Sequence, residues 1–240
     1  MKRFETTILV AALGVALAPS AQAQVSANIG AVSNYVWRGM TQTDDGPAVQ
    51  GGIDYAHESG LFLGTWASNV DFRTPDPDVE MDLYAGYAGS VGDFSYKATL
   101  IYYWYPGDNV TADFSELTLS GTYKMLTVGV AYTLTGQDDK IPDGDEMPYD
   151  SGDLYVYGSI AVPLGNDFSL TGTVGYYNFD DVADTSFTHG VIGVSKSAGD
   201  FGTFSLNVSK AWLSNDDTAA LALVDNDDEP KVFVSWIKTF

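Results

Sequence analysis

The chain has 240 residues, of which 45% are apolar and 13% aromatic, and it carries 32 acidic against 11 basic residues and no cysteine. The aromatic content excludes a disordered chain, and the lack of cysteine excludes a disulfide scaffold or a thiolate metal site. A formal charge of −21 argues against nucleic acid as a partner, because phosphate binding needs clustered Lys and Arg. No run of 18 apolar residues is present, so no membrane-spanning helix is expected.

The N-terminal residues are typical of a secretory signal peptide. Two basic residues precede an apolar run over residues 8–18, and the sequence AQA follows at 21–23. This run is too short to span a bilayer, which makes a retained anchor helix the weaker alternative. We therefore expect residues 1–23 to be cleaved, and residues 24–240 to form a single domain outside the cytoplasm.

Most of the remaining chain alternates apolar residues with small or polar ones, which is the period of a β-strand with one apolar face. No helical period continues for more than about two turns, so an all-β fold is expected. The clearest strand segments are residues 48–55, 94–104, 117–123 and 126–134.

The connections between these segments are alternately short and long. Five short turns are centred near residues 58, 91, 124, 165 and 199, and six longer connections cover 41–47, 74–80, 106–113, 136–153, 180–185 and 214–229. Six long loops and five short turns require about twelve strands. The pattern is typical of a transmembrane antiparallel up-and-down β-barrel with short periplasmic turns and long extracellular loops.

Aromatic residues favour this barrel over a secreted β-sandwich, because they occur at both ends of the apolar faces, as the girdles of a membrane barrel require. Those expected near the loop ends are Trp37, Phe72, Trp104, Tyr132, Tyr176 and Trp212; those near the turn ends are Tyr55, Tyr87, Phe94, Tyr123, Phe168 and Phe204. The last strand alternates apolar residues up to a terminal Phe240, with Lys238 as the departure. This end resembles the C-terminal strand by which outer-membrane proteins are recognised for assembly.

Three segments carry a more specific resemblance. Residues 33–43 read SNYVWRGMTQT, 60–64 read GLFLG and 80–87 read EMDLYAGY. From about Ala27 to the C-terminus the chain resembles the TorF family of porin-like proteins of proteobacteria. The resemblance implies an outer-membrane barrel for which a transport role is proposed, and it supplies no substrate.

The six long connections hold 23 of the acidic residues and one basic residue, Lys140. Such an acidic crown would attract cations within a Debye length, about 8 Å at physiological salt. Alternatively, the acidic residues could keep the protein soluble, or they could bind divalent cations between the phosphates of lipopolysaccharide. One stretch is dense enough in oxygen ligands to be a weak Ca²⁺ candidate, although it fails the EF-hand spacing and is more simply a solvated charge run. Its residues are Asp138, Asp139, Asp143, Asp145 and Glu146.

Strand parity predicts which side chains face the lumen. The pore-lining candidates are Asn34, Arg38, Asp54, Asp71, Asp82, Lys97, Tyr103, Tyr105, Glu116, Tyr155 and Tyr157. Arg38 is expected near the outer mouth, either creating a transverse field against inward carboxylates or pairing with an acid such as Asp71. The inward tyrosines could stack sugars or nucleosides along the pore, or they could fill a narrow barrel.

No catalytic residue is predicted. A hydrolase needs a nucleophile with a base, and the chain has two histidines, His57 in a predicted turn and His189 near a strand end, without a Gly-x-Ser-x-Gly or His-Glu-x-x-His motif. No cofactor is expected either.

We therefore expect a cation-favouring porin-like channel for passive diffusion of small polar solutes in the outer membrane. Its expected partners are lipid, lipopolysaccharide and the barrel-assembly machinery, which would engage the strand ending at Phe240. The alternatives are a closed structural or adhesive barrel, plugged by Tyr103, Tyr105, Tyr155 and Tyr157, and an outer-leaflet hydrolase that uses His189.

Overall fold

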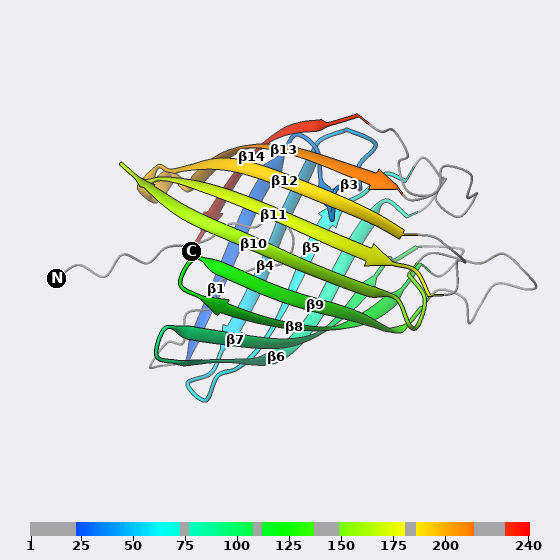
Figure 1. The fold of residues 1–240 in the computed structure, drawn as a ribbon, viewed down its shortest axis with the longest axis horizontal. Helices are drawn as coiled ribbons and strands as arrows, with labels where there is room; N and C mark the ends of the chain where they lie inside the picture. Colours follow the sequence, from blue (N-terminus) through cyan, green and yellow to red (C-terminus); the bar gives the residue numbers. More distant parts are fainter. Residues whose placement is uncertain (1–22, 73–76, 108–111, 137–148, 181–185, 214–228) are drawn as a thin grey trace, which may run out of the picture.

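The computed structural model describes residues 23–72, 77–107, 112–136, 149–180, 186–213 and 229–240. Within these ranges twelve strands form a closed antiparallel barrel (Figure 1), which confirms the predicted fold class. Each barrel strand pairs with its neighbour in the chain, and β1 closes the barrel by pairing with both β4 and β14. The strands are β1 (Gln24–Val32), β4 (Ala48–Ala56), β5 (Leu61–Asn69), β6 (Val79–Val91), β7 (Phe94–Trp104), β8 (Phe114–Tyr123), β9 (Leu126–Thr135), β10 (Leu154–Gly165), β11 (Phe168–Asn178), β12 (Ser186–Ser197), β13 (Thr203–Leu213) and β14 (Lys231–Thr239).

Helical structure in the described ranges is confined to one 3₁₀ turn, η2 (Gly199–Phe201). None of the described helical structure is long and apolar enough to cross a membrane.

The two ends of the barrel differ. Short turns join the strands at one end, and the strand ends that flank the longer connections lie at the other, toward the right in Figure 1. Gln24 pairs with Ala56 beside the first short turn, and the backbone N–H of Phe240 donates to the carbonyl of Ala27. Both ends of the described barrel therefore lie with the short turns, and we call the two ends the turn end and the loop end.

Period-two alternation gives each strand an outer and an inner face, and the outer face carries large apolar residues, as in β7. Leu100 is 51% exposed on the outer face, whereas its neighbours Thr99 and Ile101 point inward and are buried. The same exposure of large apolar side chains recurs on every barrel strand, from Val25 on β1 to Val234 on β14. A continuous apolar outer surface of this extent is costly in water, so it is suited to contact with lipid.

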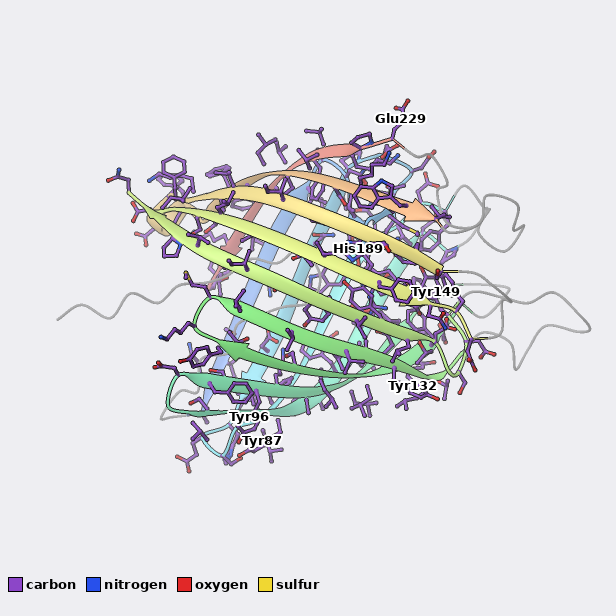
Figure 2. The ribbon with its side chains drawn as sticks, viewed as in Figure 1. Tyr87, Tyr96, Tyr132, Tyr149, His189 and Glu229 are labelled. Atoms are coloured by element: carbon purple, nitrogen blue, oxygen red, sulfur yellow. The ribbon has the colours of Figure 1, made fainter. Side chains whose placement is uncertain are left out.

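Most of the aromatic residues predicted to form two girdles do point outward. Figure 2 shows Tyr87 and Tyr96 toward the turn end and Tyr132 toward the loop end, all on the outside of the ribbon. Trp37 and Phe72 are the exceptions: Trp37 is buried inside the barrel, and Phe72 packs against Tyr105, a buried interior residue. The prediction for these two residues was wrong.

The connection between β1 and β4 departs furthest from the prediction. The sequence predicts a strand that continues through Arg38 to a loop at 41–47, but β1 ends at Val32 and the connection at 33–47 folds so that residues 34–43 are buried inside the barrel. This segment contains a small antiparallel pair, β2 (Val36–Trp37) and β3 (Met40–Thr41). We call residues 33–47 the inner hairpin.

Candidate functional site

The inner hairpin turns at Arg38 and Gly39, which connect β2 to β3. Both residues have positive φ, 47° and 92°, as a two-residue type I′ hairpin turn requires. Gly39 is also a point of close approach, since a Cβ there would lie 2.5 Å from the Cβ of His189 on the barrel wall. The turn therefore packs directly against β12.

Polar contacts hold the base of the hairpin. The Thr41 hydroxyl donates to the Asn34 side chain over 2.6 Å, and the Asn34 amide donates to Asp45 over 2.6 Å. Asp45 in turn forms an ion pair with Lys231 at the start of β14, 2.7 Å away. These bonds connect the hairpin to the barrel wall where the barrel closes.

Arg38 lies at the tip of the hairpin and forms a buried ion pair with Glu116 on β8. Its two terminal nitrogens donate to the two carboxylate oxygens over 2.8 and 2.7 Å. The guanidinium carbon also lies 4.1 Å from the ring centre of Trp37 and 4.2 Å from that of Tyr155. Burial alone would lower the pKa of Arg38, but the charge and hydrogen bonds of Glu116 outweigh it and raise that pKa, so the guanidinium stays charged.

Aromatic rings fill the barrel around the hairpin. Trp37 contacts Tyr103, Phe114 and Tyr149 with ring centres 5.4 to 6.3 Å apart. On the other side of the hairpin, Met40 belongs to a second buried cluster, whose rings are Tyr155, Tyr177, Phe179 and Phe187. Figure 2 shows His189 and Tyr149 within the half of the barrel nearer the loop end. That half has a packed core.

A second group of acids lines β6 beside the hairpin. Glu80 accepts hydrogen bonds from the hydroxyls of Tyr35, over 2.8 Å, and Tyr105, over 2.7 Å. Asp82 is two residues further along the same face and is fully buried, and neither carboxylate oxygen has a hydrogen-bond partner among the described residues. The sequence prediction had counted Glu80 in a loop, but β6 begins at Val79 and places it in the wall.

Nearer the turn end, Asp54 accepts a hydrogen bond from the Tyr84 hydroxyl over 2.6 Å. The Lys97 ammonium lies 4.7 Å from the ring centre of Phe62 and interacts electrostatically with Asp54. This part of the lumen therefore carries one charge of each sign together with aromatic rings.

The inward-facing side chains show a gradient of burial along the barrel axis. On β8, Glu116 is buried, whereas Thr118 and Ser120 toward the turn end are half-buried. On β10, Tyr155 is buried and Tyr157 half-buried. Inward positions on the remaining strands follow the same trend, with a few exceptions such as Asp54 and Phe62. The inward side chains of the turn half are therefore partly exposed to solvent, whereas the hairpin and the rings around it fill the loop half. We call the turn half of the lumen the vestibule.

Ten of the eleven predicted pore-lining residues lie inside the barrel wall or in the inner hairpin. Asp71 is the exception: it is exposed, and its backbone N–H donates to the carbonyl of Gln42 at the hairpin base. The acid that pairs with Arg38 is accordingly Glu116 and not Asp71, and Arg38 is at the tip of a hairpin rather than on a strand near the mouth. The interior residues are Asn34, Arg38, Asp54, Asp82, Lys97, Tyr103, Tyr105, Glu116, Tyr155 and Tyr157.

Sequence reasoning missed several interior residues, among them Tyr35, Trp37, Glu80 and Tyr149. The only local signal for the hairpin was the Arg38-Gly39 pair flanked by apolar residues, and hairpin turns of this type more commonly use Asn-Gly or Asp-Gly.

Asp153 precedes β10 at the loop end and is also buried. Its carboxylate accepts hydrogen bonds from the backbone N–H groups of Asp180 and Tyr149, over 2.8 and 3.0 Å, and from the Tyr177 hydroxyl over 3.3 Å. Burial nevertheless dominates and raises the pKa of Asp153 to about 6.

His189 does not have the surroundings of a hydrolytic base. Its Nε2 lies 2.8 Å from the Tyr155 hydroxyl, and its Nδ1 has no hydrogen-bond partner in the described ranges. No group of three or more acidic or histidine residues in those ranges is placed to hold a metal ion. The calcium candidates at residues 138–146 lie outside the described residues, as do residues 1–22 of the predicted signal peptide.

A closed antiparallel barrel with an apolar outer face and a polar lumen has the architecture of outer-membrane porins. The chain belongs to the family described as "Bacterial protein of unknown function (Gcw_chp)", whose model matches residues 16–240. The TorF resemblance stays a prediction, because the matching model carries a different name. No curated protein matches the chain.

Solved porin structures share the fold. The KdgM porin is 12% identical, with 90% of this chain and 99% of that chain covered and a TM-score of 0.55. The NanC porin is 10% identical, with 90% and 98% covered and a TM-score of 0.51. A second KdgM structure, titled as a complex with disordered oligogalacturonate, is 10% identical, with 90% and 98% covered and a TM-score of 0.53. At these identities the likeness concerns the fold.

Proposed function

We propose that the protein is an outer-membrane porin-like channel through which small polar solutes diffuse passively. The observation that carries this proposal is the contrast between the apolar outer face of the barrel and the partly exposed, mostly polar side chains that point into the turn half of the lumen. A soluble protein would gain nothing from this inverted arrangement, whereas a pore through a bilayer requires it. The inner hairpin then forms the constriction of the lumen.

The buried charges support a preference for cations. Among the described side chains that line the lumen, Asp54, Glu80, Asp82 and Glu116 are acidic. The bases there are Arg38, which is paired with Glu116, Lys97, which is near Asp54, and Lys231, which is paired with Asp45 of the hairpin. The acidic residues are therefore in excess at the constriction, where the low dielectric constant strengthens their field.

We propose from the apolar outer face of the barrel that the protein lies in the outer membrane. After removal of residues 1–23 the barrel would be inserted by the barrel-assembly machinery, which would engage β14, whose outward row Val232, Val234 and Trp236 leads to Phe240. Lipid and lipopolysaccharide would cover the apolar belt. The turn end would then face the periplasm.

Liposome swelling tests this function. Vesicles containing the refolded protein should swell in isotonic solutions of a pentose, and more slowly in a trisaccharide, because the constriction limits solute size. Vesicles with heat-denatured protein serve as the control. Equal, background swelling in all solutes from protein shown to be folded would contradict the channel.

A closed barrel with a structural or adhesive role is the second candidate, and the packing of the loop half favours it. The rings of Tyr103, Tyr155 and Tyr177 are buried, and the hairpin occupies the space between them. Tyr157, which the sequence had placed in such a plug, is only half-buried. Absence of swelling would favour this candidate over the channel.

A further inference from the structure

Asp82 differs from the other buried acids of the lumen. Glu116 is held by Arg38 and accepts a hydrogen bond from Tyr103, and Glu80 is held by two tyrosine hydroxyls. Asp54 accepts a bond from Tyr84. Asp82 is 0% exposed, and both of its oxygens lack a partner in the described part of the chain.

An unpaired carboxylate in this position is unfavourable, because a buried ion that has lost its hydration must gain a counter-ion or donors in return. Its neighbours increase the cost, since Glu80 and Glu116 both repel it electrostatically. Arg38 neutralises Glu116, and Glu80 has no cationic partner among its described contacts. The negative charges of Glu80 and Asp82 are therefore not compensated by this arginine. A positive charge beside Asp82 would relieve both.

We propose that Asp82 is the binding site for a monovalent metal cation, K⁺ or Na⁺, that enters from the vestibule. The proposal deepens the proposed channel function and rests on it. A divalent ion fits less well, because Ca²⁺ takes six to eight oxygen ligands and Mg²⁺ demands a near-ideal octahedron. The described residues include no group of three acids or histidines close enough to supply such a cage. A monovalent ion makes weaker demands on the charge and geometry of its ligands, so the Asp82 carboxylate together with neighbouring oxygens and water can hold it.

Asp82 on β6 lies next to the vestibule, although its carboxylate is closed off from solvent in this structure. Glu80, Asp82 and Tyr84 are successive inward residues, each about 7 Å from the next. Glu80 lies beside the hairpin, and Tyr84 is half-buried at the start of the vestibule. Asp82 is therefore at the boundary between the filled half of the lumen and the open half.

The ring of Tyr84, the next inward residue, lies along the barrel wall. Gly64 is its cross-strand partner, and a Cβ at Gly64 would contact the ring. The hydroxyl reaches over β5 to Asp54 on β4. A cation moving up the vestibule would pass the Tyr84 ring, whose face attracts positive charge, before it meets Asp82.

Substitution of Asp82 by the isosteric amide tests the site in a planar bilayer. Under a KCl gradient, Asp82→Asn should lower the ratio of cation to anion permeability about fivefold while conductance persists. The control is Asp93→Asn, which removes an exposed carboxylate at the β6–β7 turn and should leave the ratio unchanged. An unchanged ratio in Asp82→Asn would overturn the proposal.

A thermal measurement separates this site from channel function and does not depend on conductance. The wild-type barrel in detergent should melt at a higher temperature in potassium chloride than in N-methylglucamine chloride of equal ionic strength, and Asp82→Asn should lose that difference. Equal melting of the wild type in both salts would overturn the site even if the protein conducts. Stabilisation by acid alone, without a potassium effect, would also overturn it, because a proton would then occupy Asp82.

Discussion

Arg38 and Glu116, which are 78 residues apart in the chain, form a bidentate ion pair inside the barrel with N–O distances of 2.8 and 2.7 Å. Arg38 is 9% exposed and Glu116 1%. The pair connects the tip of the inner hairpin to β8. It is therefore the main polar contact between the constriction and the wall opposite its base.

Removal of one partner of the Arg38–Glu116 ion pair should lower the free energy of unfolding more than removal of both partners. Glu116→Gln leaves the guanidinium buried without a counter-charge, so the free energy of unfolding should fall by about 3–5 kcal/mol. The double variant Arg38→Met with Glu116→Leu removes both charges and should recover much of that loss. Urea titrations of the barrel in lipid vesicles measure the three values. A double variant that loses more stability than Glu116→Gln alone would contradict this account.

A methyl group at Gly39 should displace the hairpin tip. Gly39→Ala combines an unfavourable φ of 92° with a clash against His189, so we expect a loss of about 2–4 kcal/mol in the free energy of unfolding. Gly107→Ala is the matched control, because Gly107 has φ 87° and nothing within 4 Å of the added Cβ. It should lose about 1 kcal/mol. Similar losses in both variants would mean that the contact with His189 is not tight.

The cost in folding free energy of a charged residue on the outer face should depend on how deep in the bilayer it lies. Leu100 is in the middle of β7 and Val91 is the last residue of β6, and both side chains point outward. Leu100→Arg should cost about 2–4 kcal/mol of folding free energy in a bilayer, whereas Val91→Arg should cost about 0–1 kcal/mol. Vesicle-based unfolding titrations compare the two. Equal costs would argue against a membrane-spanning orientation of these strands.

Asp153 should make the stability depend on pH. Its pKa is about 6 in the folded protein and near 4 in an unfolded chain, so the folded state binds the proton more tightly. The free energy of unfolding should therefore fall as pH rises from about 4 to about 6, by up to about 3 kcal/mol, and change no further above that.

The variant Asp153→Asn isolates this contribution. Its own constant effect on stability cancels when the wild type and the variant are compared at pH 4 and pH 7. Relative to the variant, the wild type should be less stable at pH 7 than at pH 4. A stability difference that does not change with pH would refute the assignment.

The barrel could be predicted from the sequence because its determinants are local. The alternation in residues 94–104 identifies β7, and parity alone places Lys97 and Tyr103 inside. Connection lengths then gave the strand number. These patterns involve only residues close together in the chain, so they can be recognised from the sequence without knowledge of the fold.

The interior could not be predicted in the same way. The contact of Arg38 with Glu116 depends on the hairpin folding inward, and that depends on rings contributed by several distant strands. Trp37 was predicted to be a girdle residue because it is an aromatic residue beside a loop. Such a residue can lie on either face of a barrel, and the local sequence does not distinguish the two. Glu80 looked like a loop acid because nothing local shows that β6 begins at Val79.

Single-channel recording tests the central claim, that the barrel conducts and that the inner hairpin is its constriction. The comparison is between the wild type and a variant in which residues 35–42 are replaced by a short Gly-Ser linker. We predict discrete steps from the wild type and clearly larger steps from the variant, because removal of the hairpin opens the loop half of the lumen. Silence of both proteins, or steps of equal size from both, would contradict the account.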